Sequence, residues 1–259
     1  TVLGYNAVAT AIPKLEAQGE IANLIVPISE FENELNSENS ISMNLGTDYK
    51  LSSELKFGIN LFRNNIDDLI DTRIIANKTN GQNVFSYYNV NKVYTQGLEF
   101  NTTWKPINQL KITGGYQLLF AKDKAAEKEF KNGEVFARES TTSPAFQLKK
   151  EDYFGLYNRS RHMANLKVFY SIPKWKLNTN IRGTYRSKYG LFDSNGNTYL
   201  DRYDDFVDGY TIIDIAVNKT FYKNFELGLG IDNLFNFKDT QNISNIAGQI
   251  IYSKINIHF

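Results

Sequence analysis

The sequence predicts an all-β fold, a transmembrane antiparallel β-barrel, and three observations lead to that prediction. Apolar and polar side chains alternate along many segments, which is the period of a strand with one apolar and one polar face. The connections between these segments alternate between short turns and long polar stretches. No run of about 18 apolar residues occurs, so a membrane helix is not expected. Short turns at one end and long loops at the other are typical of an outer-membrane barrel.

The composition excludes several functional classes. The 259 residues suffice for one large β domain or two ordinary domains. The 29 Lys and Arg balance the 28 Asp and Glu, so no field attracts nucleic acid, and no nucleic-acid partner is expected. The absence of Cys excludes disulfides and thiolate metal sites. No signal peptide stands at the start, and the opening residues read as the interior of a longer protein.

Nine segments show the strand alternation. They are residues 41–49, 55–61, 98–104, 110–120, 164–170, 175–191, 213–221, 225–231 and 251–259. The segment 175–191 is the longest, at roughly 50 Å for about 3.3 Å per residue. The long polar connections are expected at 76–84, 124–158, 192–208 and 235–247. Aromatic residues near strand ends, such as Trp104 and Trp175, are expected to form the girdles of a barrel.

The order of short and long connections predicts the direction of the strands and the division of the chain. The last strand follows a long connection, so it starts outside the cell and ends at the periplasm. Residues 1–40 are then an extracellular loop with a remnant of an earlier strand, and residues 41–259 are barrel. Nine is an odd number, whereas bacterial single-chain barrels are even. We therefore expect the C-terminal part of a larger barrel, or a ten-stranded barrel if a strand in the first thirty residues was missed.

Four stretches occur in an order that matches one family. They are Glu34–Thr72, Tyr87–Phe100 (with Asn89, Gly97 and Glu99), Gly228–Asp239 with its "DNLFN" run, and the final "IIYSKINIHF". In the first stretch the matching residues are Leu35, Glu38, Asp67, Asp68, Leu69 and Ile70, and the usual Pro is missing. Together they resemble the barrel of the TonB-dependent outer-membrane receptors, and the resemblance covers residues 34–259.

This resemblance implies a barrel of about 22 strands closed by an N-terminal plug, in which these strands are the last nine. It implies active transport of a scarce nutrient, an iron–siderophore, haem or cobalamin rather than a glycan, across the outer membrane of a Gram-negative bacterium. The implied partners are the plug and remaining barrel strands, the TonB complex through the missing N-terminal segment, outer-membrane lipid and lipopolysaccharide, the barrel-assembly machinery and a surface lipoprotein. The assembly signal would be Tyr252, Ile255, Ile257 and Phe259.

The segment that ends the 124–158 connection mixes cations with aromatic rings. Such a mixture at a barrel mouth can hold an anionic or ring-bearing ligand. The ligand-mouth candidates are Arg138, Lys149, Tyr153, Phe154, Tyr157, Arg159 and Arg161. The alternative is an aromatic girdle whose basic residues meet lipopolysaccharide phosphates. The neighbouring His162 is predicted to face outward, which disfavours it as a haem ligand.

The most acidic stretch, "FDSNGNTYLDRYDDF", predicts a calcium loop or an Asx-rich turn. It places oxygen ligands at alternate positions, as calcium loops do. The calcium candidates are Asp193, Asn195, Asn197, Asp201 and Asp204. Thr198 and Asp204 stand where a regular loop has Gly and Glu, so the match is partial. The alternative is an extracellular turn rich in Asn and Asp with a solvated acidic edge.

No group of residues predicts an enzyme. Ser, His and Asp have no usable spacing, and the carboxylates of Asp67 and Asp68 alternate faces along a strand. Two other functions remain open. One is a smaller, complete barrel that serves as a porin or adhesin. The other is a soluble β-sandwich that binds glycans, which the strand lengths and the loop asymmetry disfavour.

Overall fold

The computed structural model describes residues 1–138, 142–221, 224–240, 242–243 and 245–257, with the main chain alone at Asn91. The chain forms two compact units. The first comprises Thr1–Ser42, Asn64–Tyr94 and Asp123–Ala125, and the second comprises Met43–Arg63, Thr95–Lys122 and Ala126–Phe259. None of the described helices has both the length and the apolar composition needed to cross a bilayer.

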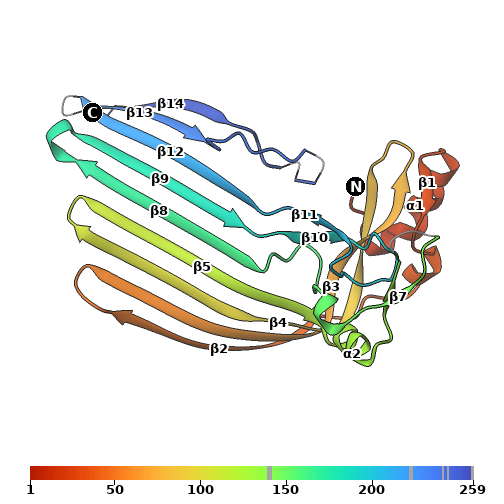
Figure 1. Ribbon diagram of the computed structural model, residues 1–259. Coiled ribbons are helices and arrows are strands. Elements are labelled where there is room, and N and C mark those ends of the chain that lie inside the picture. The colour runs from red at the N-terminus through yellow and green to blue at the C-terminus, as the bar shows by residue number, and fades with distance from the viewer. Residues whose placement is uncertain (139–141, 222–223, 241, 244, 258–259) are drawn as a thin grey trace. The chain divides into compact units, whose positions relative to one another are not determined.

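Ten strands form one antiparallel sheet in the described part of the chain: the short β1 (Ile21–Leu24), which lies in the first thirty residues, and nine long strands, which match the nine predicted ones. The long strands are β2 (Asn39–Lys50), β3 (Leu55–Lys78), β4 (Asn83–Ile107), β5 (Leu110–Asp123), β8 (His162–Ile172), β9 (Leu177–Arg186), β12 (Tyr210–Phe221), β13 (Phe225–Asp232) and β14 (Ile250–Ile257). Each pairs with its neighbours in this order. In the second unit the short turns lie together, on the left in Figure 1. The predicted all-β, antiparallel architecture is confirmed.

Several predicted boundaries were wrong, including the end of the segment 55–61 (β3) and the start of the segment 98–104 (β4). The expected strand 175–191 stops at Arg186, and the chain then forms a separate hairpin of β10 (Tyr189–Phe192) with β11 (Asp205–Val207). The expected long connection at 76–84 is a four-residue turn, since β3 ends at Lys78 and β4 begins at Asn83. β3 and β4 have 24 and 25 residues, whereas about 9–11 residues cross a bilayer. Alternation alone could not find the end of β9, because the alternating pattern continues past Arg186 into β10.

The sheet of the second unit has one apolar face that no other layer formed by the described residues of that unit covers. Large apolar side chains on it stay exposed, among them Leu166 (50%), Ile181 (43%), Leu229 (57%) and Ile251 (73%). The opposite face carries polar side chains, because successive residues of a strand point to opposite sides. A soluble protein buries such an apolar face, whereas a membrane barrel turns it toward lipid.

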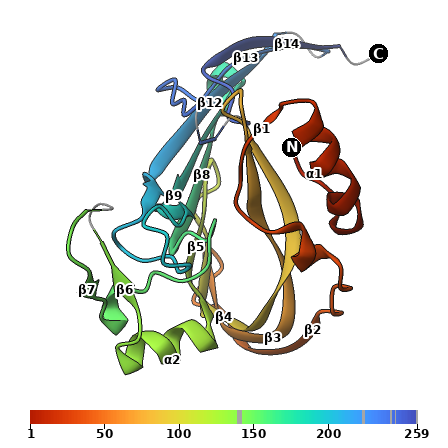
Figure 2. The same ribbon diagram turned by 90° about the vertical axis from the view of Figure 1, so that its right-hand side faces the viewer.

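The first unit contains a helix that the alternation pattern did not predict. Its elements are η1 (Tyr5–Ala7), α1 (Val8–Ala17), β1 (Ile21–Leu24), which pairs with β3, and η2 (Ile28–Phe31). Val8 and Ile12 lie one turn apart on α1 and are 1% and 0% exposed. They pack with Ile75 of β3 and Val84 of β4. Figure 2 shows α1 next to β1. The N-terminal residues thus have an apolar core of their own.

The long connections of the second unit also contain short elements. These are α2 (Lys124–Asn132), which begins in the first unit, β6 (Phe136–Ala137), β7 (Phe146–Gln147) and η3 (Lys150–Asp152). A 3-10 turn, η4 (Pro173–Trp175), joins β8 to β9. The connections are therefore folded segments that can hold side chains in fixed positions.

Candidate functional site

Two long connections of the second unit, residues 126–161 and 187–209, pack on each other, and we call them the outer loops. Phe130 stacks on Tyr153 with ring centres 5.0 Å apart and meets the edge of Tyr199 at 5.6 Å. Phe130 and Tyr153 are only 2% and 3% exposed. The main-chain N–H of Phe154 donates to the carbonyl of Leu200 at 2.9 Å. This apolar cluster fixes the two outer loops relative to each other.

Polar contacts join the same two segments. The Tyr199 hydroxyl donates to Glu129 Oε2 at 2.5 Å. Arg202 Nε forms an ion pair with Asp152 Oδ1 at 2.9 Å, and the Asp152 carboxylate is buried while Arg202 is exposed. Because Asp152 Oδ2 also accepts the main-chain N–H of Lys149 at 2.7 Å, the buried charge is fully partnered. These polar contacts, together with the apolar cluster, hold the two outer loops in a fixed arrangement.

Two cations and three aromatic rings form a continuous series of contacts that involves both outer loops, and we call these residues the cation–aromatic ladder. It consists of Phe120, Arg161, Phe154, Phe206 and Lys188. The guanidinium of Arg161 lies 5.3 Å from the centre of Phe120 and 5.1 Å from that of Phe154. Phe154 meets Phe206 edge-on at 4.8 Å, and Lys188 Nζ lies 4.7 Å from the centre of Phe206. Such contacts stabilise by about 0.5–2 kcal/mol each.

The ladder carries two positive charges, those of Arg161 and Lys188, and no ion pair with a carboxylate is found for either of them among the described residues. Beside it, Arg186 lies 3.9 Å over the ring of Tyr189 and donates to Ser160 Oγ at 2.7 Å. Burial raises the pKa of the Tyr189 phenol above its ordinary value, against the opposing effect of Arg186. The arrangement offers cations and aromatic faces to an anionic, ring-bearing ligand.

The structure brings some of the predicted ligand-mouth residues together and separates others. Phe154 and Arg161 lie in the ladder. Tyr153 lies in the apolar cluster, where its ring has almost no exposed surface. Tyr157 and Arg159 are partly buried in the segment that leads to Arg161, and the side chains of Arg138 and Lys149 are exposed outside the ladder.

Sequence reasoning missed three members of the ladder, Phe120, Phe206 and Lys188. They come from the end of β5, from β11 and from the residue before β10. Each is an ordinary strand-end aromatic or surface lysine in its own segment. No local pattern connects them, so only the packing of the outer loops could reveal the group.

The side-chain oxygens of the five calcium candidates accept hydrogen bonds from within one turn and hold it in place. Asp193 Oδ1 accepts the N–H of Gly196 at 2.7 Å, and its Oδ2 accepts that of Thr198 at 2.6 Å. Asp201 Oδ2 accepts the side-chain amides of Asn195 and Asn197 at 2.9 and 2.8 Å.

The two Asn carbonyl oxygens and Asp204 are engaged in the same way. Asn195 Oδ1 accepts the N–H of Asn197, and Asn197 Oδ1 accepts that of Tyr199. Asp204 Oδ1 accepts the N–H of Ser194, and its Oδ2 accepts that of Asp201 at 2.7 Å. Calcium needs about six to eight oxygen ligands, whereas here each candidate side chain already accepts N–H groups.

The turn therefore does not fit a calcium cage in this conformation. Among the described residues, no group of three or more His, Asp or Glu is suited to a metal ion. Asp201 is 0% exposed and Asp204 8%. Burial raises the pKa of the Asp204 carboxyl to about 6, although the main-chain N–H groups that donate to this carboxylate oppose the rise. Calcium binding stays a prediction that would require these hydrogen bonds to be replaced.

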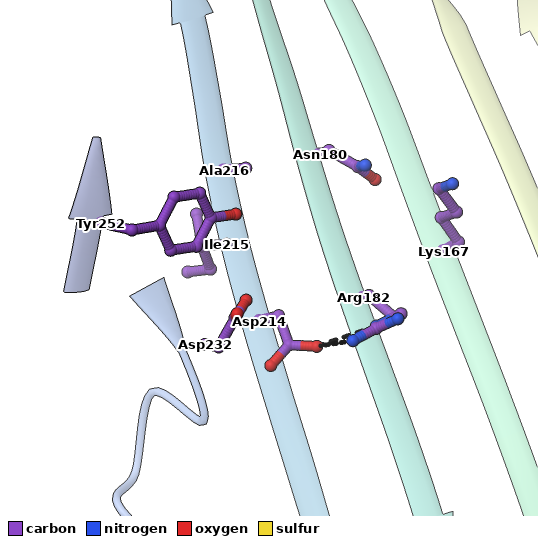
Figure 3. Close-up of a pocket in the computed structure, with 8 residues that line it drawn as sticks. All are labelled: Lys167, Asn180, Arg182, Asp214, Ile215, Ala216, Asp232 and Tyr252. Carbon is purple, nitrogen blue, oxygen red and sulfur yellow. Dashed lines mark hydrogen bonds and ion pairs between the residues drawn. The ribbon is translucent and has the colours of Figure 1, made fainter. Parts of the chain in front are cut away.

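A polar pocket of about 210 Å³ lies on the polar face of the sheet, across β8, β9, β12, β13 and β14. Figure 3 shows Arg182 and Asp214 joined across it, with Nη2 and Oδ2 2.6 Å apart. Asn180 Oδ1 is buried there and has no hydrogen-bond partner among the described atoms. The pocket thus contains a buried hydrogen-bond acceptor without a described partner, Asn180 Oδ1, beside the ion pair of Arg182 with Asp214.

The motif residues of the resemblance hold irregular main chain in place. Asn89 Nδ2 donates to the carbonyls of Asp68 at 2.7 Å and Asn36 at 3.1 Å, and its Oδ1 accepts the N–H of Asn36 at 2.9 Å. Asp68 has a φ of 56° within β3, a left-handed conformation that L-residues rarely adopt. A Cβ at Gly97 would lie 1.9 Å from the Leu118 carbonyl oxygen, so a side chain there would separate β4 from β5.

Two further motif residues act through side-chain hydrogen bonds. Glu99 accepts Asn60 Nδ2 at 3.1 Å and Gln117 Nε2 at 2.9 Å, which joins β3, β4 and β5 on the polar face. Asn233 has a φ of 52°, and its amide donates to the carbonyls of Phe237 and Ala247. The "DNLFN" run thus ties down the start of the connection between β13 and β14.

The predicted assembly residues lie on β14, except for Phe259, which lies outside the described residues, as does His258. Ile255 and Ile257 are 60% and 55% exposed on the apolar face. Tyr252 points to the other face, where a Cβ on Gly230 would lie 2.3 Å from its ring carbon Cζ. His162 Nδ1 lies 2.7 Å from the hydroxyl of Tyr116, a neighbour on β5.

Several solved bacterial receptors have a similar fold. A mutant of the ferric enterobactin receptor PfeA from Pseudomonas aeruginosa has 19% sequence identity and a TM-score of 0.56, over 87% of this chain and 32% of that one. The siderophore receptor PirA from Acinetobacter baumannii has 18% identity and a TM-score of 0.55, over 87% and 32%. The ferric-catecholate import receptor Fiu from Escherichia coli has 17% identity and a TM-score of 0.57, over 92% and 30%.

These likenesses establish the fold, and the chain spans about a third of the length of each receptor. No curated protein sequence matches the chain. A family model described as "TonB dependent receptor-like, beta-barrel" matches residues 18–234, which is most of the chain. That family consists of transport receptors in the outer membrane of Gram-negative bacteria. The chain belongs to the TonB-dependent receptor β-barrel family and is part of such a barrel.

Proposed function

We propose that this chain supplies wall strands and part of the ligand mouth of an active-transport receptor that captures an iron–siderophore complex. The cation–aromatic ladder carries this proposal. Arg161 lies between the rings of Phe120 and Phe154 and has no carboxylate partner within the described residues. A cation held over ring faces attracts a ligand that is both anionic and aromatic.

Ferric catecholates have that chemistry, because aromatic rings surround a complex with net negative charge. Two proteins of similar fold, a ferric enterobactin receptor and a ferric-catecholate import receptor, support the same ligand class. Haem shares the ring and the anionic groups, whereas cobalamin lacks the high negative charge. The proposed order of preference is therefore ferric catecholate, then haem, then cobalamin.

The proposed partners follow from membership in the family. A plug domain and further wall strands would complete the barrel, and the TonB complex would drive release of the ligand through an N-terminal segment. The barrel-assembly machinery would recognise β14, while lipopolysaccharide and lipid would surround the apolar face. A surface lipoprotein over the outer loops is a further proposed partner.

A smaller, complete barrel acting as a porin or adhesin is the second candidate, and the strand directions argue against it. Nine antiparallel wall strands give β2 and β14 the same direction. Closure between them would therefore create a parallel pair. No pairing of β2 with β14 occurs among the described residues.

A ligand panel tests the proposed function. The full-length receptor that contains this chain would be titrated in detergent with a ferric catecholate, haem and cobalamin, and quenching of its intrinsic fluorescence would report binding. We expect the ferric catecholate to bind most tightly and to be imported in a host with an intact TonB system. Preferential binding of cobalamin, or uptake that persists without TonB, would refute the proposal.

A further inference from the structure

The short-turn rim of the second unit has a lysine on the face that otherwise meets lipid. Along β12 the outward series is Ile213, Ile215, Val217, Lys219 and Phe221. Lys219 lies opposite Leu227 of β13 and Leu177 of β9, so its neighbours on that face are apolar. A lysine facing lipid is unfavourable unless its ammonium reaches a polar partner at the membrane surface.

The ammonium of Lys219 does reach the rim. Its Nζ donates to the carbonyl of Trp175 at 3.3 Å and lies 5.6 Å from the ring centre of Phe221. Trp175 closes the η4 turn and is 59% exposed, as expected of a tryptophan at the interface between lipid and water. An ammonium has three donors, and the Trp175 carbonyl takes one of them.

Two further lysines belong to the turn that carries Trp175. Lys174 and Lys176 are exposed on the same turn, and Lys176 has a φ of 48°. The carbonyl of Lys176 accepts the N–H of Thr220 at 2.9 Å, which fixes the turn beside the end of β12. Within the described residues neither lysine has an ion-pair partner.

Glu226, a carboxylate near the start of β13, does not compete for Lys219. Glu226 lies opposite Thr220 and therefore faces the polar side, whereas Lys219 faces the apolar side. Its Oε1 also accepts the amide of Asn256 at 3.1 Å. The rim thus combines three ammonium groups with exposed aromatic and aliphatic surface.

We propose that Lys219, Lys174 and Lys176 bind the phosphodiester headgroup of an anionic phospholipid, whose acyl chains lie along Leu177, Leu227 and Phe221. A phosphate oxygen accepts the donors that Trp175 leaves unused, and the adjacent apolar face receives the acyl chains. Free phosphate shares the headgroup chemistry but gains nothing from that apolar face. This inference rests on family membership and on the apolar face, and not on the proposed ligand.

The test compares lipids on the full-length receptor that contains this chain. Purified receptor would be titrated with short-chain phosphatidylglycerol, with phosphatidylcholine and with inorganic phosphate, and bound species would be counted by native mass spectrometry. We expect phosphatidylglycerol to bind at least tenfold tighter than either other probe. Lys219→Gln should weaken it about five-fold, since a lysine near an anionic lipid surface contributes about 1 kcal/mol.

Matched variants keep the result interpretable. Lys111→Gln removes an exposed charge from the polar face of β5 and should leave lipid binding unchanged. The double variant Lys174→Gln/Lys176→Gln alters only the turn, so its loss of affinity cannot come from a disturbed strand. Equal binding of the two lipids, an equal loss in Lys111→Gln, or phosphate binding as tight as that of phosphatidylglycerol would overturn the proposal.

Discussion

The guanidinium of Arg161 lies 5.1 Å from the ring centre of Phe154, and the two residues belong to a segment that enters β8. Phe154 is held in turn by the edge of Phe206. The position of the cation therefore depends on both outer loops. The affinity for a ligand that contacts Arg161 would therefore depend on how the two outer loops pack on each other.

Replacement of this cation should weaken ligand binding without unfolding the barrel. We expect Arg161→Gln to reduce affinity for a ferric catecholate by about 2- to 30-fold, the equivalent of a cation–ring contact of about 0.5–2 kcal/mol. Equilibrium titration of the full-length receptor would measure it. Arg138→Gln is the matched control, because that exposed arginine lies outside the ladder. Equal effects of both changes would reduce the role of Arg161 to general electrostatic attraction.

The three hydrogen bonds of the Asn89 side chain to Asn36 and Asp68, which we call the brace, predict opposite effects for two substitutions. Asn89→Ala removes three hydrogen bonds to Asn36 and Asp68 and should destabilise this part of β3 by about 1–3 kcal/mol. Asp68→Gly relieves a left-handed φ of 56° and should be neutral or stabilising. Hydrogen exchange across β3 would measure both.

Asp67→Gly is the control for the brace, because Asp67 is not among the positive-φ residues. It should destabilise the strand, as glycine usually does. If Asp68→Gly proved as damaging as Asp67→Gly, the strained φ would not be the relevant feature.

The buried Asp204 predicts a pH dependence of the 193–204 turn. Its pKa is about 6 in the fold, against about 3.9 in an unfolded chain. Since the folded form binds the proton more tightly, the stabilisation from Asp204 is complete below pH of about 4 and is lost as pH rises through about 6. Protease resistance of the turn should therefore be greater at pH 5 than at pH 7.5.

The wild-type difference should shrink in Asp204→Asn, which cannot titrate at this position. The comparison must be made between the two proteins at each pH, so that other carboxylates cancel. A wild-type turn that resists protease better at pH 7.5, with no change in Asp204→Asn, would contradict the assignment.

The ring of Tyr252 covers Gly230 and predicts a size limit there. Gly230→Ala would place a Cβ 2.3 Å from the Tyr252 ring, which should displace the ring and destabilise the β13–β14 pair by about 1–3 kcal/mol. Gly183→Ala is the control, because nothing lies within 4 Å of its Cβ position. Thermal unfolding of the purified barrel would compare them. Tyr252→Ser in the Gly230→Ala background should restore stability, and failure of that rescue would point to a backbone effect.

The hydrogen-bonded conformation of the 193–204 turn predicts no response to calcium, in contrast to the calcium loop predicted from the sequence. The side-chain oxygens of Asp193 and Asp201 already accept N–H groups, so an added cation has few free ligands there. Proteolysis with either millimolar calcium or a chelator should give the same cleavage pattern. Protection by calcium that disappears in Asp201→Asn would instead establish the predicted calcium loop.

The sequence determined the wall of the barrel, because a strand of period two records its two environments in alternate residues. In β13, for example, the apolar Leu227 and Leu229 alternate with Glu226 and Gly228. This alternation identifies the two faces of the strand before any pairing is known. It also contained the motif residues Asn89, Gly97 and Asn233, whose family pattern was readable although their contacts were not.

Only the tertiary structure decided how the irregular segments fold and which side chains meet. The helix α1 is stabilised by Ile75 and Val84, which are far away in sequence, and the ladder joins Phe120 to Phe206 through Arg161 and Phe154. Such groups form by packing between distant segments, so no local periodicity predicts them. The sequence by itself therefore determined the strands and their faces, whereas the outer loops, their cations and the lysine rim required the fold.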